Sequence, residues 1–597
     1  MDKIALKNKI RALEGLTNDE KAALLELLNK QKKYGLVWED KPEDVEERLR
    51  DELPVLKEVK ERFIPSDDPE APNHILIEGD NLEALTALTY THAGKIDVIY
   101  IDPPYNTGNK DFVYNDSFVD SEDSFRHSKW LSFMNKRLKL AKGLLSEKGV
   151  IFISIDDNEQ AQLKLLCDEV FGGNNFISGL IWEKKYTQSN DAKFFSNNHD
   201  HILCYGKSID NVSIGLLPRS ERMNQAYRNP DNHPKGPWKS TPLHARSGSA
   251  NSANFKYTFK NGVTFTPPIG TFSRYSASSL KAFDENNEIW FGKDGKSIPS
   301  RKTFLCDLKK NGVVPTTIIS YELGGHNHEA VDELKYILND NLFTSPKPSK
   351  LIRLLISIGS NLKTCTILDF FAGSGTTLHA TMQLNAEDGG HRKCILVTNN
   401  ENNICEKVTY ERNKRVINGY TTPKGEEVKG LKSNTLRYYK TDFVSRDQSA
   451  KNMRALVAAS TDLLCIKNDI YTEAPFAGKH LNSKIARYFE NRHTRMLVIY
   501  NKDYIFDIVN LLTDVAMDER GKIKVYTFAD GRYAYDDDFM EVADKVELCA
   551  LPAAIYDAYK HVLPKRKPQY LPEALIDKEA AEASAAATST QGSFNFD

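Results

Sequence analysis

The chain has few cysteines, no long apolar run and almost no net charge, and each of these absences narrows what it can be. Its eight cysteines among 597 residues include no Cys-x-x-Cys pair and no His/Cys cluster at metal-ligand spacing. A disulfide scaffold and a structural zinc site are therefore not expected. No apolar run approaches the roughly 20 residues that cross a bilayer, and the mixed-charge N-terminus lacks the apolar core of a signal peptide. These features fit a cytoplasmic protein without a membrane partner.

The net charge of −2 gives no overall sign of a nucleic-acid partner, but one segment departs from it. Residues 207–310 contain 17 Lys or Arg and 8 Asp or Glu, a balance of +9. Basic side chains neutralise phosphates, and aromatic faces stack on bases or wedge between them. A solvated surface around a small core explains the same pattern equally well. The aromatic residues among these charges are Tyr227, Trp238, Phe255, Tyr257, Phe265, Phe272, Tyr275 and Trp290.

Strands and helices alternate from residue 74 to about 206 and again from 348 to about 399, which predicts a parallel, doubly wound α/β sheet. Between them, residues 207–330 are rich in Gly, Pro, Ser and Asn and predict an inserted, mostly β or irregular module. One sheet is therefore expected from two blocks, 66–206 and 331–435. The predicted strands are 74–80, 95–101, 150–156, 364–370 and 393–399; the predicted helices are 81–93, 130–149, 159–172, 348–360 and 376–386.

The two ends of the chain differ from this pattern. Residues 1–65 are strongly charged and predict an N-terminal helical segment. Residues 436–576 predict a further α/β domain with strands near 496–500 and 522–528, and they carry no recognisable chemistry. From 577 the composition is of low complexity, which predicts a disordered tail. A chain of this length is expected to form several domains.

The first chemical motif, Asp102-Pro103-Pro104-Tyr105, comes directly after the predicted strand 95–101. Ligands in open α/β sheets bind at such strand ends. An aryl amine such as adenine N6 is a poor nucleophile because its lone pair is delocalised into the ring. A carboxylate and a backbone carbonyl can accept its two hydrogens, and Asp102 and Pro103 supply them. Pro104 stiffens the turn and Tyr105 can stack on the base, although an ordinary Pro-Pro turn is the alternative interpretation.

The second motif follows the predicted strand 364–370 and leads into the predicted helix 376–386. Its two glycines let the backbone approach a ligand closely, and the helix N-terminus favours a carboxylate such as that of an amino-acid cofactor. It lacks the third glycine of a dinucleotide fingerprint and the lysine of a phosphate loop, so NAD and ATP are poorly supported. The motif consists of Asp369, Phe370, Phe371, Ala372, Gly373, Ser374, Gly375, Thr376 and Thr377.

Together the two motifs, 267 residues apart (369 − 102), resemble the amino-methylating DNA methyltransferases of the permuted β class. In that class the catalytic D-P-P-Y precedes an F-x-G-x-G cofactor loop, with a target-recognition domain between them. Three further stretches match in order, IEGDNLEAL, GVIFISIDDNE and FTSPKPSKLIRLLI, so that the resemblance covers about 65–435. Two others, YRNPDNHPKGPW and LVTNNENN, resemble modification subunits of Type III restriction–modification systems. The resemblance implies a Rossmann-like fold of the S-adenosylmethionine-dependent type.

The same resemblance assigns the cofactor contacts. The loop of Phe370, Phe371, Ala372, Gly373, Gly375 and Thr376 would wrap the methionine part of S-adenosylmethionine, with Asp369 near its amino group. Asp80, with Asn81, would border the adenine, although Asp80 is also a good N-cap for the helix 81–93. Thr344 and Lys347 would close the pocket from the other side. No metal is needed, because the sulfonium already makes the methyl group electrophilic.

One departure concerns the cofactor ribose. The strand 393–399 should end near an acidic residue that binds the ribose hydroxyls. This chain has Thr398, Asn399 and Asn400 there, with Glu401 one position late. The ribose-binding residue therefore stays open.

The resemblance predicts methylation of adenine N6 in double-stranded DNA, with the base flipped out of the duplex. Asp in place of Ser at position 102 favours adenine N6 over cytosine N4 within the class. Alternatives are a cytosine-N4, RNA or solitary methylase, a non-catalytic specificity subunit for a nuclease, and a bifunctional restriction enzyme, for which nuclease motifs are missing. By analogy the partners are a restriction subunit and a second copy of the chain. The tail 591–596 resembles a sliding-clamp-binding peptide.

Overall fold

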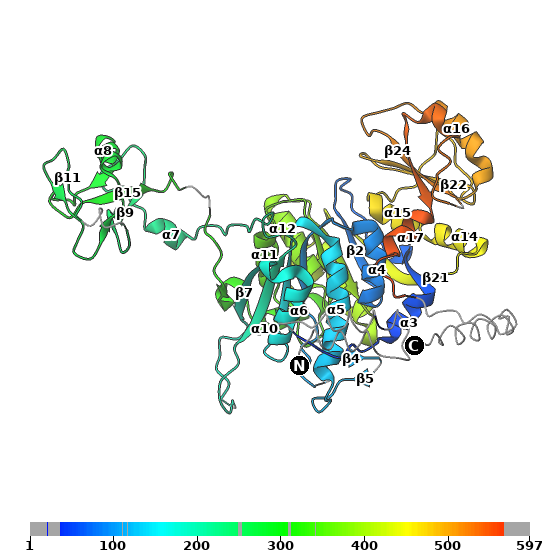
Figure 1. Cartoon of the computed structure of the whole chain (residues 1–597), viewed down its shortest axis with the longest axis horizontal. Helices are drawn as coiled ribbons and strands as arrows, with labels where there is room; N and C mark the ends of the chain where they lie inside the picture. The colour runs from blue at the N-terminus through cyan, green and yellow to red at the C-terminus, as the bar shows by residue number, and fades with distance from the viewer. Residues whose placement is uncertain are drawn as a thin grey trace, which may run out of the picture. The chain divides into compact units, whose positions relative to one another are not determined.

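The computed structural model (Figure 1) describes residues 21, 36–109, 111–115, 117–190, 192–248, 254–308, 312–340, 342–529 and 531–565. Within these ranges the chain forms two compact units. The larger unit runs to Ser213 and resumes at Thr317, and the smaller one is Ile214–Thr316. The tail predicted from 577 and its clamp-like peptide lie outside the described residues.

The larger unit is built on a ten-stranded sheet whose six central strands run parallel. Both predicted blocks contribute to it, which confirms the α/β, Rossmann-like fold class. In spatial order the strands are β1 (Glu52–Glu58), β21 (Thr435–Ser445), β2 (Asn73–Glu78), β18 (Lys393–Thr398), β17 (Thr366–Asp369), β3 (Ile96–Ile101), β6 (Leu145–Ile155), β8 (His199–Gly206), β7 (Phe176–Glu183) and β16 (Ile318–Ile319).

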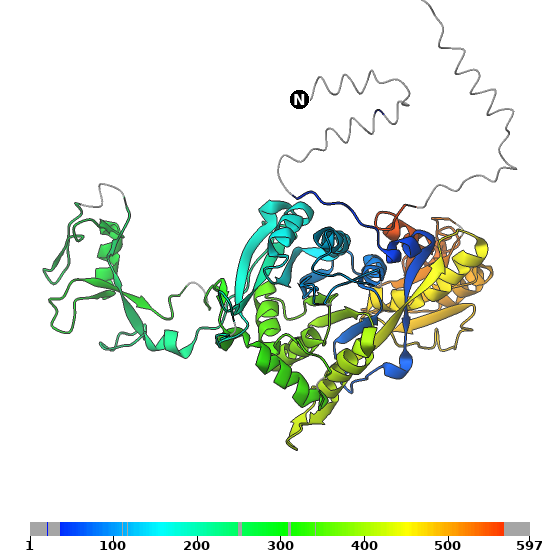
Figure 2. The same cartoon turned by 90° about the horizontal axis from the view of Figure 1, so that it is seen from below.

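Helices cover both faces of this sheet, as Figure 2 shows from below. Successive residues of a strand point to opposite faces. The principal helices are α4 (Asn81–His92), α5 (Arg126–Leu144) and α6 (Gln160–Cys167) on one face, and α11 (Ser349–Gly359) and α12 (Thr376–Asp388), which pack on each other, on the other side. On β3, Ile99 and Ile101 share a buried cluster with α4, α5 and α6, whereas Val98 faces Gly359 of α11.

Two expectations about the sheet were wrong. The sheet is mixed rather than parallel, because β8 pairs antiparallel with β6 and β7, and β1 pairs antiparallel with β21. The helix predicted to close at Gly149 ends at Leu144, and β6 begins at the next residue. Leu145 still lies at helical spacing from Leu138 and Ala141, and this spacing cannot distinguish the last helical turn from the start of a buried strand.

The ends of the predicted domains also differ from expectation. Residues 52–58, predicted to be helical, form β1, whose apolar run Leu53–Leu56 is buried against β21. The N-terminal segment does contain a helix, α3 (Asp44–Asp51). Strand β21 lies beyond the boundary expected at 435, so the catalytic sheet extends into the segment predicted to form another unit. Local patterns missed this pairing because its partners are almost 400 residues apart.

A second sheet of four strands follows in the same unit. It is ordered β22 (Ala486–Glu490), β23 (Arg495–Ile499), β24 (Ile523–Phe528) and β25 (Val546–Leu551). Helix α16 (Ile505–Thr513) packs on it through the buried residues Ile508 and Leu512. Helix α17 (Ala553–Tyr559) ties this region to β1, since the Tyr559 hydroxyl donates to the Pro54 carbonyl at 2.9 Å.

The smaller unit has its own core under a three-stranded sheet of β14 (Ile289–Trp290), β15 (Ser300–Phe304) and β9 (Trp238–Pro242). Several of the aromatic residues considered for base stacking belong to this core instead. Phe265 is buried with Leu280 of helix α8 (Ala277–Glu285), and Trp238 packs on Trp290 with ring centroids 5.1 Å apart. Aromatic content among basic residues therefore reflects packing here, as the alternative interpretation held.

None of the described helices is long and apolar enough to cross a membrane. All eight cysteines are free thiols, and six of them are buried.

Candidate active site

The two chemical motifs meet at one edge of the sheet. Asp102 follows β3, the Asp369 loop follows β17, and these strands are hydrogen-bonded parallel neighbours. Asp80 follows β2, which is also parallel and is separated from β17 by β18 alone. Because parallel strands all end at the same edge, segments from three distant parts of the sequence lie together there.

The turn after β3 is fixed on several sides. Trp130 of α5 donates its indole N–H to the Pro104 carbonyl at 2.8 Å, which leaves that of Pro103 as the one expected to meet a substrate amine. Asn106 adopts a left-handed φ of 57°, a conformation that Asn tolerates better than most residues. Its buried amide donates to Glu159 at 2.5 Å. The turn is therefore a rigid support for the side chain of Asp102.

Both carboxylate oxygens of Asp102 have partners. The Tyr105 hydroxyl donates to Oδ1 at 3.0 Å, and Lys347 forms an ion pair with Oδ2. Burial raises the pKa of the Tyr105 phenol well above its ordinary value, so the phenol stays protonated and remains a donor. Lys347, expected to close the cofactor pocket, thus contacts the first residue of the catalytic motif.

A second carboxylate also contacts the hydroxyl of Tyr105. Asp200, buried at the start of β8, lies 3.4 Å from the Tyr105 hydroxyl and pairs with Lys184 at 2.7 Å. The Tyr105 hydroxyl is therefore shared between two acids. A chain of cations, carboxylates and a neutral phenol of this kind holds each member in one orientation, because moving one leaves a buried neighbour unpaired.

The glycine loop after β17 has the backbone that its sequence predicts. Gly373 and Gly375 have φ of 49° and 73°, in the left-handed region that favours glycine. A Cβ on Gly375 would lie 2.5 Å from the amide nitrogen of Asn413 and 3.0 Å from Thr409. These two buried residues also hold the loop, since their side chains donate to the carbonyls of Gly375 and Gly373. The loop then leads into α12.

Asp369 links the beginning of this loop to the first turn of α12. One of its oxygens accepts from the Phe371 N–H at 3.0 Å and the other from the Thr377 hydroxyl at 2.5 Å. The side chain is buried, and burial is the main cause that raises the pKa of its carboxyl to about 7. Ala372 joins the loop to β18 through its N–H and the Val397 carbonyl at 3.1 Å.

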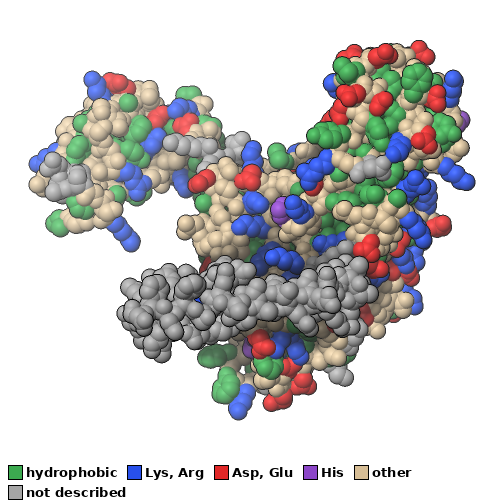
Figure 3. All heavy atoms as spheres, turned by 45° about the vertical axis from the view of Figure 1, so that its right-hand side comes forward, with side chains coloured by type: hydrophobic (Ala, Val, Ile, Leu, Met, Phe, Trp, Pro, Cys, Tyr) green, Lys and Arg blue, Asp and Glu red, His purple; other side chains and the backbone are tan. Residues whose placement is uncertain are grey.

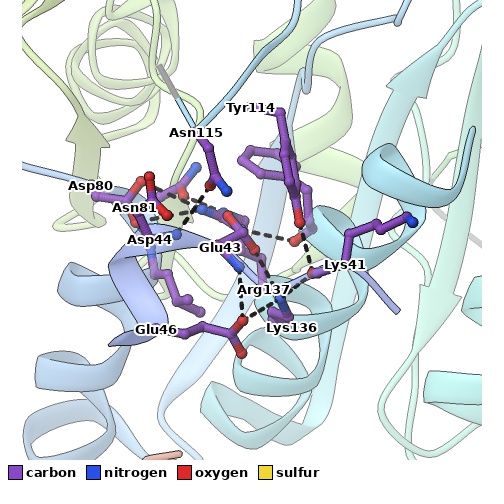
Figure 4. A network of polar contacts seen from close by, with 12 residues as sticks. Lys41, Glu43, Asp44, Glu46, Asp80, Asn81, Tyr114, Asn115, Lys136 and Arg137 are labelled. Atoms are coloured by element: carbon purple, nitrogen blue, oxygen red, sulfur yellow. Dashed lines mark hydrogen bonds and ion pairs between the residues drawn. The ribbon is translucent and has the colours of Figure 1, made fainter. Parts of the chain in front are cut away.

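Arg137 of α5 links the remaining predicted cofactor residues (Figure 4). It is fully buried and donates to Asn81, and to both oxygens of Glu43 at 2.9 and 3.0 Å. Its other nitrogen lies 3.4 Å from Asp80. Asp80 also caps α4 by accepting from the Leu82 N–H at 2.7 Å, so the helix-cap interpretation is confirmed.

Asn81 connects this network to the glycine loop, since its amide donates to the Phe370 carbonyl at 3.2 Å. The ring of Phe371 is half-buried and packs on Phe133, with centroids 5.8 Å apart. The guanidinium of Arg137 lies 3.6 Å from the centroid of the same Phe133 ring. Arg137 therefore bridges the N-terminal segment, the end of β2 and the loop after β17.

We expect Arg137→Met to lower the free energy of unfolding by about 3–5 kcal/mol, because Glu43 and Asp80 would lose their buried partner. Urea denaturation would measure this. The control is Lys129→Met on the same helix, which removes a half-exposed ion pair with Asp123 and should cost no more than about 1 kcal/mol. Equal stability of the two variants would show that the Arg137 network does not hold this edge together.

Among the described residues, Thr344 and Thr376, two of those predicted to contact the cofactor, form no hydrogen bond or ion pair with the Arg137 and Asp102 networks. Thr344 is exposed, on the segment before α11. The side chain of Thr376 is buried and accepts from Arg412 at 2.7 Å. After β18, Asn399 is exposed and Asn400 accepts from the Glu406 N–H at 3.2 Å.

Arg137, Asp200 and Lys184 were missed by sequence reasoning. Arg137 had a usable signal, since it lies at helical spacing with the buried residues Trp130 and Met134, where an apolar residue is expected. Asp200 had none, because its partners are set by the pairing of β8 with β6.

Comparison with known proteins agrees with this geometry. The sequence model of a family described as DNA methylase (N6_N4_Mtase) matches residues 96–418, which is more than half of the chain. The chain belongs to this DNA methylase family. The matched range begins with β3 and ends with α13 (Glu411–Asn418), so it contains both chemical motifs and the smaller unit.

Individual relatives are modification enzymes. The chain is 37% identical over 369 residues to the Type III restriction–modification enzyme StyLTI Mod subunit of Salmonella typhimurium strain LT2, covering 57% of this chain and 55% of that protein. It is 34% identical to the EcoPI Mod subunit of Escherichia phage P1, with 60% and 62% covered. With the Type II methyltransferase M.KpnI of Klebsiella pneumoniae it shares 30% identity, covering 58% and 84%. The matches thus span about half to two thirds of the Type III relatives.

Proposed function

We propose that this DNA methylase transfers a methyl group from S-adenosylmethionine to N6 of adenine in double-stranded DNA. The observation that carries the proposal is that Asp102 and the glycine loop follow two hydrogen-bonded parallel strands and so share one edge of the sheet. Membership of the family and the identity to Mod subunits support it. The DNA-recognition role falls to the smaller unit, Ile214–Thr316, by its basic character.

The residues after β17 and β2 fit this cofactor. Gly373 and Gly375, both at positive φ, have no Cβ and leave the loop backbone open to a ligand, and the half-buried Phe371 offers an apolar face. Asp80 and Asn81, held by Arg137, would meet the adenosine part, and Asp369 the amino group. When bound, the cofactor supplies an electrophilic methyl group on sulfonium.

The chain's own residues would prepare the amine. The carboxylate of Asp102 and the carbonyl of Pro103 accept the two hydrogens of the flipped base, which keeps the nitrogen lone pair out of the ring and directed at the methyl group. Tyr105 remains a neutral donor that orients Asp102. Lys347 occupies the second oxygen of Asp102, so an entering amine must share or replace that contact.

The raised pKa of Asp369 predicts a pH-dependent cofactor affinity. Between pH 6 and 7 the carboxyl changes from mostly neutral to half ionised, and an ionised carboxylate attracts the cofactor's ammonium group. The affinity should therefore rise about fivefold over this interval. The rise should end near pH 8, where an α-amino group loses its own proton. Isothermal titration calorimetry across this range would measure it.

Asp369→Asn should make the affinity nearly independent of pH over the same interval. Glu83→Gln is the matched control, because burial also raises the pKa of Glu83 to about 7 but its carboxylate accepts from Thr441. A pH profile that stays steep in Asp369→Asn would contradict the role given to Asp369.

The free energy of unfolding should fall with pH while the cofactor affinity rises. The pKa of Asp369 is higher in the folded than in the unfolded chain, so this group stabilises the fold at low pH, and that contribution is lost as the pH rises through 7.

The function is tested by long-read detection of modified bases in DNA from a methylation-free host that expresses the full chain. N6-methyladenine on one strand of a short asymmetric site would support a Type III-like modification subunit. Both strands of a palindrome would indicate a solitary enzyme, and N4-methylcytosine would overturn the base but keep the mechanism. Absence of any modified base, with cofactor bound, would favour a non-catalytic specificity subunit.

As a Mod-like subunit the chain would act in the bacterial cytoplasm with a restriction subunit and a second copy of itself. The proposal extends to the tail 591–596 as a clamp-binding peptide. Deleting the last seven residues should leave methylation of purified DNA unchanged.

A further inference from the structure

The loop that joins β7 to β8, residues 184–198, exposes a pair of phenylalanines. The side chains of Phe194 and Phe195 are 81% and 94% exposed, more than any other phenylalanine among the described residues. Single exposed apolar residues are ordinary, but two adjacent exposed phenylalanines form an apolar surface of the kind that binds a partner. In Figure 3, green hydrophobic side chains project at the lower edge of the molecule next to blue Lys or Arg side chains.

The loop has internal structure that supports this exposure. Its two arms are joined by the Lys185 N–H and the Asn198 carbonyl at 3.2 Å, and by the Asn198 amide and the Thr187 carbonyl at 3.2 Å. Nearer the tip, the Ser189 N–H donates to the Ser196 hydroxyl at 2.9 Å. These cross-links keep the arms together and direct the tip away from the sheet (Figure 1).

The base of the loop lies beside the catalytic motif. Lys184, the first residue of the loop, pairs with Asp200, the second residue of β8, and Asp200 accepts from the hydroxyl of Tyr105. Strand β8 is antiparallel to β6, and His201 pairs with Ile155 at the carboxyl end of β6. The loop therefore extends from the same edge of the sheet as Asp102, and its position is tied to that of the catalytic side chains.

The charge of the loop indicates what it meets. It contains Lys184, Lys185 and Lys193 against the single acid Asp191, and the ammonium of Lys193 lies 5.2 Å from the Phe194 ring centroid. Cations beside exposed aromatic rings complement a polyanion with stacked bases. An apolar protein partner would not account for the basic residues next to the pair.

We propose that Phe194 and Phe195 form a wedge that enters the DNA duplex beside the target base. Turning a base out of the stack leaves its neighbours unstacked, and this costs free energy. Apolar side chains inserted between base steps restore part of the lost stacking. The wedge would hold the duplex open while the base reaches Asp102, with Lys185 and Lys193 on the flanking phosphates. This inference rests on the proposed function and assigns to it the residues that drive base flipping.

The test uses the full chain and a duplex that carries its methylated site, with 2-aminopurine, which fluoresces when unstacked, at the target position. The wild type should give a strong fluorescence increase, and Phe194→Ser/Phe195→Ser should not. Single-turnover methylation by the double variant should fall about 10- to 100-fold on an ordinary duplex. On a duplex whose target adenine faces an abasic site, where flipping costs less, the rate should recover to within about threefold of the wild type.

Controls separate the wedge from other roles. Phe506→Ser removes a phenylalanine that is 76% exposed on α16 and should leave flipping intact, and Phe194→Trp/Phe195→Trp should retain it. Full fluorescence in the serine variant, or an equal loss on both duplexes, would overturn the wedge. So would weaker DNA binding with normal flipping, or a change of oligomeric state, which would assign the pair to docking. Methylation by the wild type tests the proposed function separately.

Discussion

Asp102→Ala should reduce single-turnover methylation by about 10²- to 10⁴-fold, the range typical for loss of a positioned proton acceptor. The carboxylate is the one acidic acceptor in the turn after β3, and it is held by Tyr105 and Lys347. Its removal leaves the amine nitrogen planar and unoriented. Quench-flow measurement of methyl transfer to a defined duplex would give the rate.

The loss should be confined to chemistry, so the affinity for S-adenosylmethionine should stay within about threefold. Asp97→Ala is the matched control at the other end of β3. Asp97 accepts from the Thr366 N–H at 2.9 Å and the Ser146 hydroxyl at 3.1 Å, and its loss should lower stability without removing activity. If Asp102→Ala lost cofactor binding and methylation equally, Asp102 would be a structural residue.

Gly375→Ala should lower the affinity for S-adenosylmethionine by about 100-fold or more. The new Cβ would meet Asn413 at 2.5 Å and Thr409 at 3.0 Å, and both neighbours are fully buried and cannot move aside. The loop must shift instead, and a displacement of even an ångström at a binding loop is costly. Equilibrium dialysis with labelled cofactor would measure the affinity.

Gly389→Ala provides a control at the opposite end of α12. Gly375 precedes α12 and Gly389 follows it, and their φ angles are 73° and 66°. A Cβ on Gly389 has nothing within 4 Å, so this variant carries only the cost of a left-handed alanine, about 1–2 kcal/mol of stability. If both variants bound the cofactor alike, backbone strain rather than crowding would explain the effect.

The sequence predicted the parts of the fold that depend on local pattern. The apolar strands around Ile75, Val98 and Leu368 and the helices that follow them were found because their periodicity is strong and their motifs punctuate the strand ends. The catalytic and cofactor motifs were found because both lie in turns directly after predicted strands, and the composition of these turns departs from that of ordinary loops.

What the sequence did not reveal depends on pairing between distant segments. The sequence of β1 was predicted to be part of a charged helical segment, because its pairing with β21, which buries Leu53 and Leu56, is not visible in the local pattern. The contact between Lys347 and Asp102 was also hidden, because these two residues are 245 positions apart (347 − 102) and their meeting is set by the fold. Arg137 shows the limit most clearly, since its four contacts come from three separate segments.

The position of β1 also sets an order of events during synthesis. Glu52 pairs with Ser445, so the first strand of the sheet must wait for about 400 more residues before its partner exists. At 5–20 residues per second this takes roughly 20–80 s on the ribosome. During that time the buried run Leu53–Leu56 has no strand to cover it, and the edge of β2 is bare as well. The catalytic sheet can be completed only after the whole DNA methylase match, residues 96–418, has been made, so a nascent chain that already carries both motifs still lacks the strand that closes its sheet.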